Sequence, residues 1–156
     1  MRNPTTPALD VDEVAPIRRI SENLIILARV SPTTRVLIAG PLSTVVSNEL
    51  CRRRCAGIVT TASRGSWIGK QYDVALVPWY RTPLDGLDVT LKWLVRSIHR
   101  HGAFAIWVGR DEDRTGCKLR TMLDRIGLRI EVGTFCENGF AVVARRLEIV
   151  PLAIAA

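Results

Sequence analysis

The sequence lacks a long apolar run, an internal repeat and a low-complexity tract. Its longest apolar stretch, the tail at 149–156, is far shorter than the roughly 20 residues that a membrane-spanning helix needs. The first ten residues, MRNPTTPALD, contain no apolar core of the kind that directs secretion. We therefore expect a cytoplasmic protein that does not enter a membrane.

Metal-binding side chains are scarce. The four cysteines are Cys51, Cys55, Cys117 and Cys136, none of them in a C-x-x-C pair, and the two histidines lie close together at 99 and 101. Zinc sites need cysteine and histidine ligands at characteristic spacings, which are missing here. We expect no metal, and we interpret the cysteines as small apolar residues of a reduced protein.

Lysine is almost absent: three lysines stand against 19 arginines, and the net charge is +7. A basic balance favours acidic partners such as nucleic acid. The arginines are spread along the whole chain, however, and solvated helix faces account for most of them. Nucleic acid therefore remains one of several partners that the composition allows.

The apolar pattern alternates between strand-like and helix-like segments. The chain is long enough for one compact domain, which we place at 15–156 behind a flexible leader at 1–14. Helices are expected at about 17–28, 43–55, 84–101 and 117–126, and strands at 35–39, 58–61, 72–77, 103–108, 128–135 and 140–147. Asn138-Gly139 predicts a tight turn between the last two strands. The order predicts a three-layer α/β fold with a mostly parallel, doubly wound sheet and a C-terminal antiparallel hairpin.

Proline and glycine suggest where the helices begin and end. Pro16 suits the first turn of a helix, because its missing N–H has no partner there. Gly57, Gly102 and Gly127 are expected to end helices. The segment 99–101 then occupies a last helical turn, where positive charge complements the helix dipole.

This order of elements resembles the class I S-adenosylmethionine-dependent methyltransferases over about 17–147. The resemblance rests on TRVLIAG at the first strand and glycine loop, on YDVALVPWY, on HGAFAIWVG, and on LRTMLDRIGLRIEVGTFCENGFAVVARR as the last helix and closing hairpin. It implies that the loop after the first strand and the end of the second strand bind the cofactor. The corresponding residues here are Gly40, Pro41, Leu42, Thr60 and Thr61.

Three departures from the family pattern indicate a degraded cofactor site. The family's G-x-G-x-G loop keeps only Gly40, because Leu42 and Thr44 replace the next two glycines and narrow the approach of a ligand. The acidic residue that follows the family's second strand is replaced by Thr60 and Thr61. About ten residues then lead to Tyr72, too few for the helix and strand usual there, so the fold is shortened. S-adenosylmethionine is expected to bind weakly or not at all.

The sequence VPWY at 77–80 lies where amino-methylating relatives carry an N-P-P-Y type motif. Pro78, Trp79 and Tyr80 match its proline and aromatic character, and the two rings could stack on a base. Val77 replaces the polar residue that orients an amine. The competing interpretation is that Pro78 ends a strand and both rings pack on the sheet. Asp73, inside the strand, is expected to accept hydrogen bonds from nearby backbone donors.

Two functions remain open. The first is a methyltransferase-like domain that has lost or altered cofactor binding and acts as a binding or regulatory subunit, with a protein partner or a second copy; the apolar tail at 149–156 supports docking. The second is an atypical active methyltransferase acting on nucleic acid or another acidic substrate. A receiver-like domain is disfavoured, because no acidic cluster follows the first strand and the chain closes in a hairpin.

Overall fold

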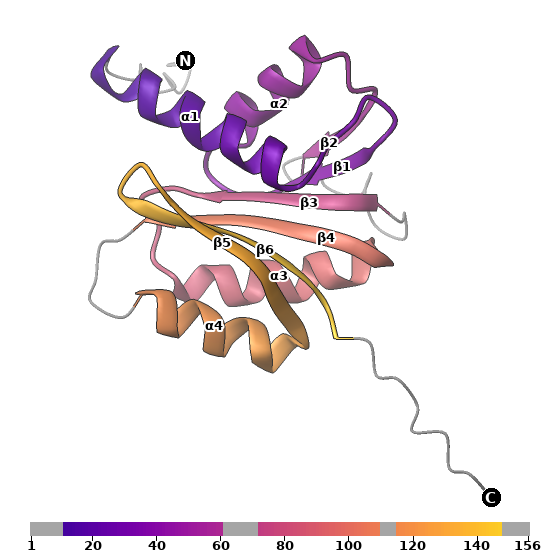
Figure 1. The fold of residues 1–156 in the computed structure, drawn as a ribbon, viewed down its shortest axis with the longest axis vertical. Helices are drawn as coiled ribbons and strands as arrows, with labels where there is room; N and C mark the ends of the chain where they lie inside the picture. The colour runs from indigo at the N-terminus through magenta and orange to yellow at the C-terminus, as the bar shows by residue number, and fades with distance from the viewer. Residues whose placement is uncertain (1–10, 61–71, 110–114, 148–156) are drawn as a thin grey trace, which may run out of the picture.

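The computed structural model describes residues 11–60, 72–109 and 115–147. The helices are α1 (Val11–Leu27), α2 (Ser43–Arg52), α3 (Asp85–Ser97) and α4 (Thr115–Ile126). The strands are β1 (Arg35–Ile38), β2 (Gly57–Thr60), β3 (Tyr72–Trp79), β4 (Ile98–Gly109), β5 (Leu128–Cys136) and β6 (Gly139–Arg146). Figure 1 shows α1 and α2 on one face of the sheet and α3 and α4 on the other, which confirms the predicted three-layer α/β class.

The six described strands form one sheet in the order β2-β1-β3-β4-β6-β5. β1 pairs in parallel with both β2 and β3, and β3 pairs in parallel with β4. β6 returns antiparallel between β4 and β5, as the predicted hairpin requires. The sheet is therefore mixed, with a parallel half that carries the crossing helices and an antiparallel half that closes the fold.

Two apolar cores lie on opposite faces of this sheet. Leu91 of α3 and Leu119 of α4 contribute to one core, and Leu24 of α1 and Leu50 of α2 contribute to the other. β3 is buried almost throughout, because helices cover both of its faces. That burial explains why its sequence is a continuous apolar run rather than an alternating pattern.

The predicted end of the third helix was wrong. α3 ends at Ser97 and β4 begins at Ile98, so residues 99–101 belong to a strand and not to a last helical turn. Gly102 is buried in that strand, where a Cβ would lie 2.8 Å from the Asp73 carbonyl oxygen and would collide with Ile98. Close packing against β3, rather than a helix stop, explains this glycine.

Three smaller boundaries also differ from expectation. α1 begins at Val11, which leaves Pro16 inside the helix. α2 ends before Arg54, whose φ of 61° provides the left-handed turn that Gly57 was expected to make. The hairpin exists, but its positive φ angles belong to Glu137 (49°) and Asn138 (58°). The prediction that Gly127 ends α4 is confirmed, with a φ of 87°.

Some predicted features fall outside the described residues. These are the first ten residues of the expected leader, Thr61 after β2, and the tail at 149–156. Within the described ranges, no helix is both long enough and apolar enough to span a membrane.

Candidate functional site

The candidate site lies where the chain leaves β1 and β3 toward opposite faces of the sheet. The two strands are neighbours, with Ile38 in register with Leu76. β1 continues into α2 on one face, whereas β3 continues into α3 on the other (Figure 1). Open α/β sheets bind ligands beyond the carboxyl ends of strands at such a point of divergence.

Gly40 occupies this point and packs directly against the end of β3. Its φ is 115°, and a Cβ there would lie 3.1 Å from the Pro78 carbonyl oxygen and 3.5 Å from Cε3 of the Trp79 ring. A side chain at position 40 would therefore be strained in backbone conformation and crowded by β3. Packing within the protein therefore requires a glycine at position 40.

The rest of the loop leads directly into α2. Leu42 is buried at 6% exposure, whereas Pro41 is exposed. The Ser43 hydroxyl donates a hydrogen bond of 2.6 Å to the Gly40 carbonyl oxygen. Among the described residues, the N–H groups of Thr44 and Val45 have no acceptor. The loop thus turns one apolar side chain inward and leaves the positive end of a helix dipole near its surface.

Trp79 is a buried member of the core that lies under α3. It is 8% exposed, and its indole Nε1 donates a 3.0 Å hydrogen bond to the Pro83 carbonyl oxygen. The far side of the ring faces Gly86, where a Cβ would lie 3.2 Å from Cζ2. The indole therefore lies between Gly40 and Gly86 and holds the loop after β3 against the start of α3.

Tyr80 points to the opposite face from Trp79. It is partly buried against the core under α1 and α2, and its ring is tilted at 37° to Trp107, 5.8 Å away. The Arg81 guanidinium carbon lies 5.3 Å from the Tyr80 ring centre, within the range of a cation–π contact. The two aromatic rings therefore do not form one continuous stacking surface.

Pro78 is compatible with a central strand because of where its nitrogen faces. Leu76 accepts a hydrogen bond from the N–H of Ala39, so it faces β1. Pro78, two residues further on, faces the same side, beyond the last pair between β1 and β3. The proline nitrogen thus faces a position beyond the end of β1, so its missing N–H removes no hydrogen bond between β1 and β3.

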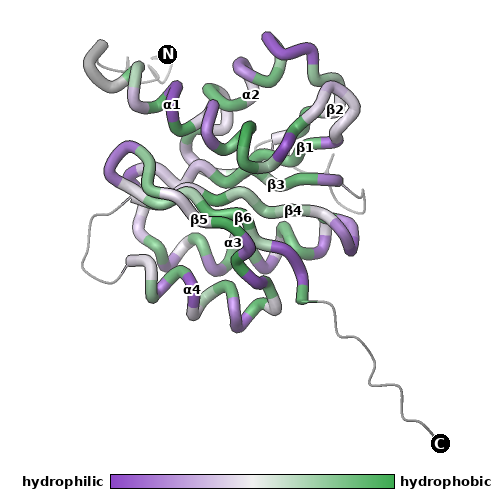
Figure 2. Tube along the Cα trace, in the orientation of Figure 1, coloured by the Kyte–Doolittle hydropathy of each residue, from purple (hydrophilic) through white to green (hydrophobic). Residues whose placement is uncertain are grey.

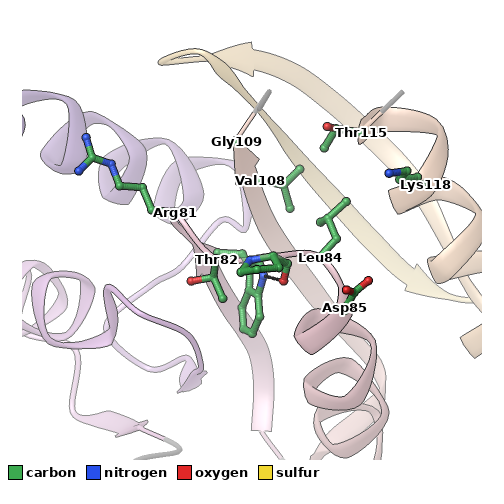
Figure 3. Close-up of a pocket in the computed structure, with 10 residues that line it drawn as sticks. Arg81, Thr82, Leu84, Asp85, Val108, Gly109, Thr115 and Lys118 are labelled. Carbon is green, nitrogen blue, oxygen red and sulfur yellow. Dashed lines mark hydrogen bonds between the residues drawn. The ribbon is translucent and has the colours of Figure 1, made fainter. Parts of the chain in front are cut away.

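A pocket of about 490 Å³ lies just beyond Trp79, at the ends of β3 and β4. It is lined by Trp79, Arg81, Thr82, Pro83, Leu84, Asp85, Val108, Gly109, Thr115 and Lys118. In Figure 3, Thr115 and Lys118 of α4 lie across from Asp85 of α3, and Arg81 extends away from the other labelled side chains. No group of His, Cys, Asp and Glu suited to a metal ion occurs among the described residues.

Solved structures with the same fold were found by comparison. One is a TehB-like SAM-dependent methyltransferase from Corynebacterium glutamicum, with a TM-score of 0.62, 15% identity, and 82% of this chain and 88% of that chain covered. Another is a SAM-dependent methyltransferase from Aquifex aeolicus, with a TM-score of 0.59, 12% identity, and coverage of 85% and 93%.

A third is the ribosomal protein L11 methylase from Lactobacillus delbrueckii subsp. bulgaricus, with a TM-score of 0.63, 10% identity, and coverage of 81% and 76%. The chain has a class I methyltransferase-like fold. At these identities the likeness is one of fold alone. The sequence matches no protein-family model and no curated protein.

The structure brings together some of the predicted site residues of this methyltransferase-like domain. Gly40 meets Pro78 and Trp79, and Leu42 is buried at the start of α2. Thr60 ends β2 on the far side of β1, paired with Ile38. Thr61 lies outside the described residues. Whether any of these residues contacts a ligand stays a prediction.

The pocket residues after Trp79 were missed in the sequence. Arg81 to Asp85 and Thr115 to Lys118 lie in connections and at the predicted starts of helices, and we assigned none of them a binding role. One signal was available: in a parallel sheet every strand-to-helix connection emerges at the same edge. The ends of β3 and β4 therefore had to lie beside the end of β1.

Asp73 and His99 lie at the opposite edge, where the strands begin. One Asp73 oxygen accepts the Arg35 backbone N–H at 2.8 Å, which agrees with the backbone-acceptor role expected for this carboxylate. Its other oxygen lies 3.0 Å from His99 Nε2, while His99 Nδ1 accepts the backbone N–H of His101 at 3.0 Å. These contacts tie β1, β3 and β4 together, which is a structural role for His99.

Proposed function

We propose that this methyltransferase-like domain binds S-adenosylmethionine weakly or not at all and acts in the cytoplasm as a binding or regulatory subunit. The observation that carries the proposal is the packing of Gly40 against Pro78 and Trp79. The backbone of the loop, which the family uses to approach its cofactor, lies here against the protein's own strand. A protein partner or a second copy of the chain would then be the ligand.

Two further features support weak cofactor binding. Leu42 occupies the second glycine position and is buried rather than displaced from the loop. Thr60 ends β2 without a carboxylate, so ribose hydroxyls would meet a weaker hydrogen-bond acceptor there. The open N–H groups of Thr44 and Val45 are the part of the loop that still suits an anionic group.

Titration calorimetry tests this proposal. S-adenosylmethionine and S-adenosylhomocysteine, added to millimolar concentration, are expected to bind with a dissociation constant above about 10 μM or not detectably. A tighter constant, equivalent to more than about 7 kcal/mol of binding free energy, contradicts the proposal. A variant with Leu42→Gly and Thr44→Gly restores the family's glycine pattern. Binding that appears only in this variant would assign the loss to those two side chains.

The pocket beyond Trp79 favours the second candidate, an active methyltransferase. Its volume of about 490 Å³ is within the range of small-molecule sites, and it adjoins the point where a methyl donor would lie. Transfer of a labelled methyl group to RNA or DNA, absent without the protein, would support this candidate over the first.

A further inference from the structure

The edge of the sheet opposite the pocket is rich in exposed arginine. We call this edge, where the strands begin or β6 ends and where the helices end, the amino edge. The exposed arginines that the structure describes there are Arg29, Arg35, Arg52, Arg53, Arg54, Arg96, Arg100, Arg125 and Arg129. Figure 2 shows strongly hydrophilic colour at the end of α2, the start of β4 and the end of β6, all on this side.

Acidic side chains neutralise only part of this charge. Three carboxylates of the amino edge form ion pairs with arginine: Glu49 with Arg52 and Arg53, Asp73 with Arg35, and Glu131 with Arg145. Among the described residues, no ion pair involves the five remaining exposed arginines that lack an aromatic contact: Arg29, Arg54, Arg100, Arg125 and Arg129. The amino edge therefore keeps a clear positive excess.

Arg29 and Arg54 follow the ends of α1 and α2, two helices that contact each other. The Cys55 thiol contacts the Ser31 carbonyl oxygen at 3.7 Å, which brings the two helix ends together. Arg35 begins β1 next to them and is in register with Gly57. Three exposed arginines thus lie at one corner of the molecule.

The backbone of Arg29 and Arg54 makes this corner unusual. Their φ angles are 53° and 61°, in the left-handed region that glycine favours after a helix. α4 follows the usual choice, with Gly127 at the equivalent position. Both arginines are exposed and form no ion pair within the described chain. Glycine would adopt these φ angles with less backbone strain than arginine does. We therefore infer that the two arginines are present for a contact outside the chain.

Favourable interaction with a helix dipole explains the presence of only some of the arginines at the amino edge. It accounts for Arg96 and Arg125, which lie in the last turns of α3 and α4. It does not explain Arg100 and Arg129, which belong to strands. A helix end would also accept lysine, yet every exposed basic side chain that the structure describes at this edge, histidines aside, is an arginine.

We propose that the amino edge binds the phosphate backbone of nucleic acid. Guanidinium groups pair with phosphate oxygens through two parallel hydrogen bonds, which favours arginine over lysine. Six strands at about 4.8 Å spacing give a row roughly 24 Å long, which matches a stretch of backbone rather than a single phosphate. Such contacts are independent of base sequence. The surface faces away from the pocket, so the inference holds whether or not the pocket binds a cofactor.

Fluorescence anisotropy with the full chain tests this surface. The probes are a labelled RNA single strand and a labelled DNA duplex of mixed sequence, titrated over a range of salt concentrations. The test variant is Arg29→Gly with Arg54→Gly, which suits both backbones and should keep or raise the melting temperature. The matched control is Arg18→Ala with Arg120→Ala, which removes the same charge from exposed positions on α1 and α4 away from this edge.

The proposal expects measurable binding that weakens as salt rises. The test variant should lose at least about fivefold in affinity, and its salt slope should fall by about 1.4 to 1.8, the value for two lost phosphate contacts. The control should lose less than about twofold. Absence of binding by the natural sequence, or equal losses in the two variants, would overturn the proposal. Binding to anionic vesicles with the same dependence on Arg29 and Arg54 would also overturn it, in favour of a membrane surface.

Discussion

At the scale of single residues, Trp79 explains how the end of β3 is held. Its ring fills the space between two glycines, Gly40 and Gly86, while its Nε1 satisfies the Pro83 carbonyl oxygen. Because the ring is 8% exposed and belongs to a core, packing is a sufficient reason for its presence. Tyr80 is different, since it is only partly buried and packs on the other face.

We therefore predict unequal effects of alanine at these two positions. Trp79→Ala should lower the free energy of unfolding by about 3–5 kcal/mol, because it leaves a cavity and an unpaired carbonyl. Tyr80→Ala should cost less, roughly 1–2 kcal/mol. Urea unfolding followed by circular dichroism measures both values. A stable Trp79→Ala protein that has lost a ligand would instead identify Trp79 as a binding residue.

At the scale of elements, the direct junction between α3 and β4 depends on Arg146. Its Nη2 donates to the carbonyl oxygens of Val95 and Ile98, the latter at 2.7 Å. These carbonyls lie where α3 stops, so the side chain from β6 caps the helix end. The buried Nε of Arg146 has no partner among the described residues. The cap therefore joins three elements through one guanidinium.

Removing this cap should destabilise the fold more than removing an exposed arginine. We predict that Arg146→Met lowers the free energy of unfolding by about 2–3 kcal/mol, since charged hydrogen bonds to buried carbonyls are lost. Arg129→Met, on exposed β5 with no ion pair among the described residues, serves as the control and should change stability by less than about 0.5 kcal/mol. Thermal and urea unfolding of both variants measure the two changes in the free energy of unfolding. Similar losses in the two would show that the cap contributes little.

The same junction shows why one boundary could not be predicted. Ile98 continues the helical spacing of Leu91 and Leu94, and it is buried whether the chain there is helical or extended. Local periodicity therefore does not distinguish the two states. The distinction comes from Tyr72, with which Ile98 pairs across the sheet. That contact joins distant parts of the chain, which a local pattern does not contain.

At the scale of the whole molecule, two buried groups make stability depend on alkaline pH. Burial raises the pKa of the Cys55 thiol above its ordinary value of 9.0, and burial likewise raises the pKa of the Tyr72 hydroxyl above 10.0. In both cases the unfolded chain loses the proton more readily than the folded one. The stability that these groups contribute is present below pH 9 and is lost as pH rises through the folded-state values.

We predict that the free energy of unfolding falls as pH is raised above about 9, and that Cys55→Ala makes this fall shallower. Thiol labelling provides a second measurement. Exposed Cys51 and Cys117 should react within minutes at pH 8, whereas buried Cys55 should react only on unfolding. Mass spectrometry identifies the labelled positions. Rapid modification of Cys55 in the native state would contradict the packing between α1 and α2.

The overall fold was predictable because each helix and strand carries its own apolar pattern. β1 after Arg35 and β3 after Asp73 are continuous apolar runs, and α3 shows a helical apolar stripe. The β5–β6 hairpin contains a short polar turn. The candidate site was predictable only in part. The position of Gly40 at the end of β1 follows from chain order, but its contact with the Pro78 carbonyl oxygen depends on three-dimensional packing. The pocket likewise depends on how α3 and α4 approach each other.

The absence of any connecting residue between Ser97 and Ile98 limits where this protein can change in length. An added residue there would shift Ile98 out of register with Tyr72 and move the carbonyls that Arg146 caps. The turn at Glu137 and Asn138 has an exposed asparagine at its tip, and lengthening it leaves the β5–β6 pairing in place. Homologues should therefore show insertions at that turn and none at the junction, and peptide tags inserted into the chain should be tolerated in the same order.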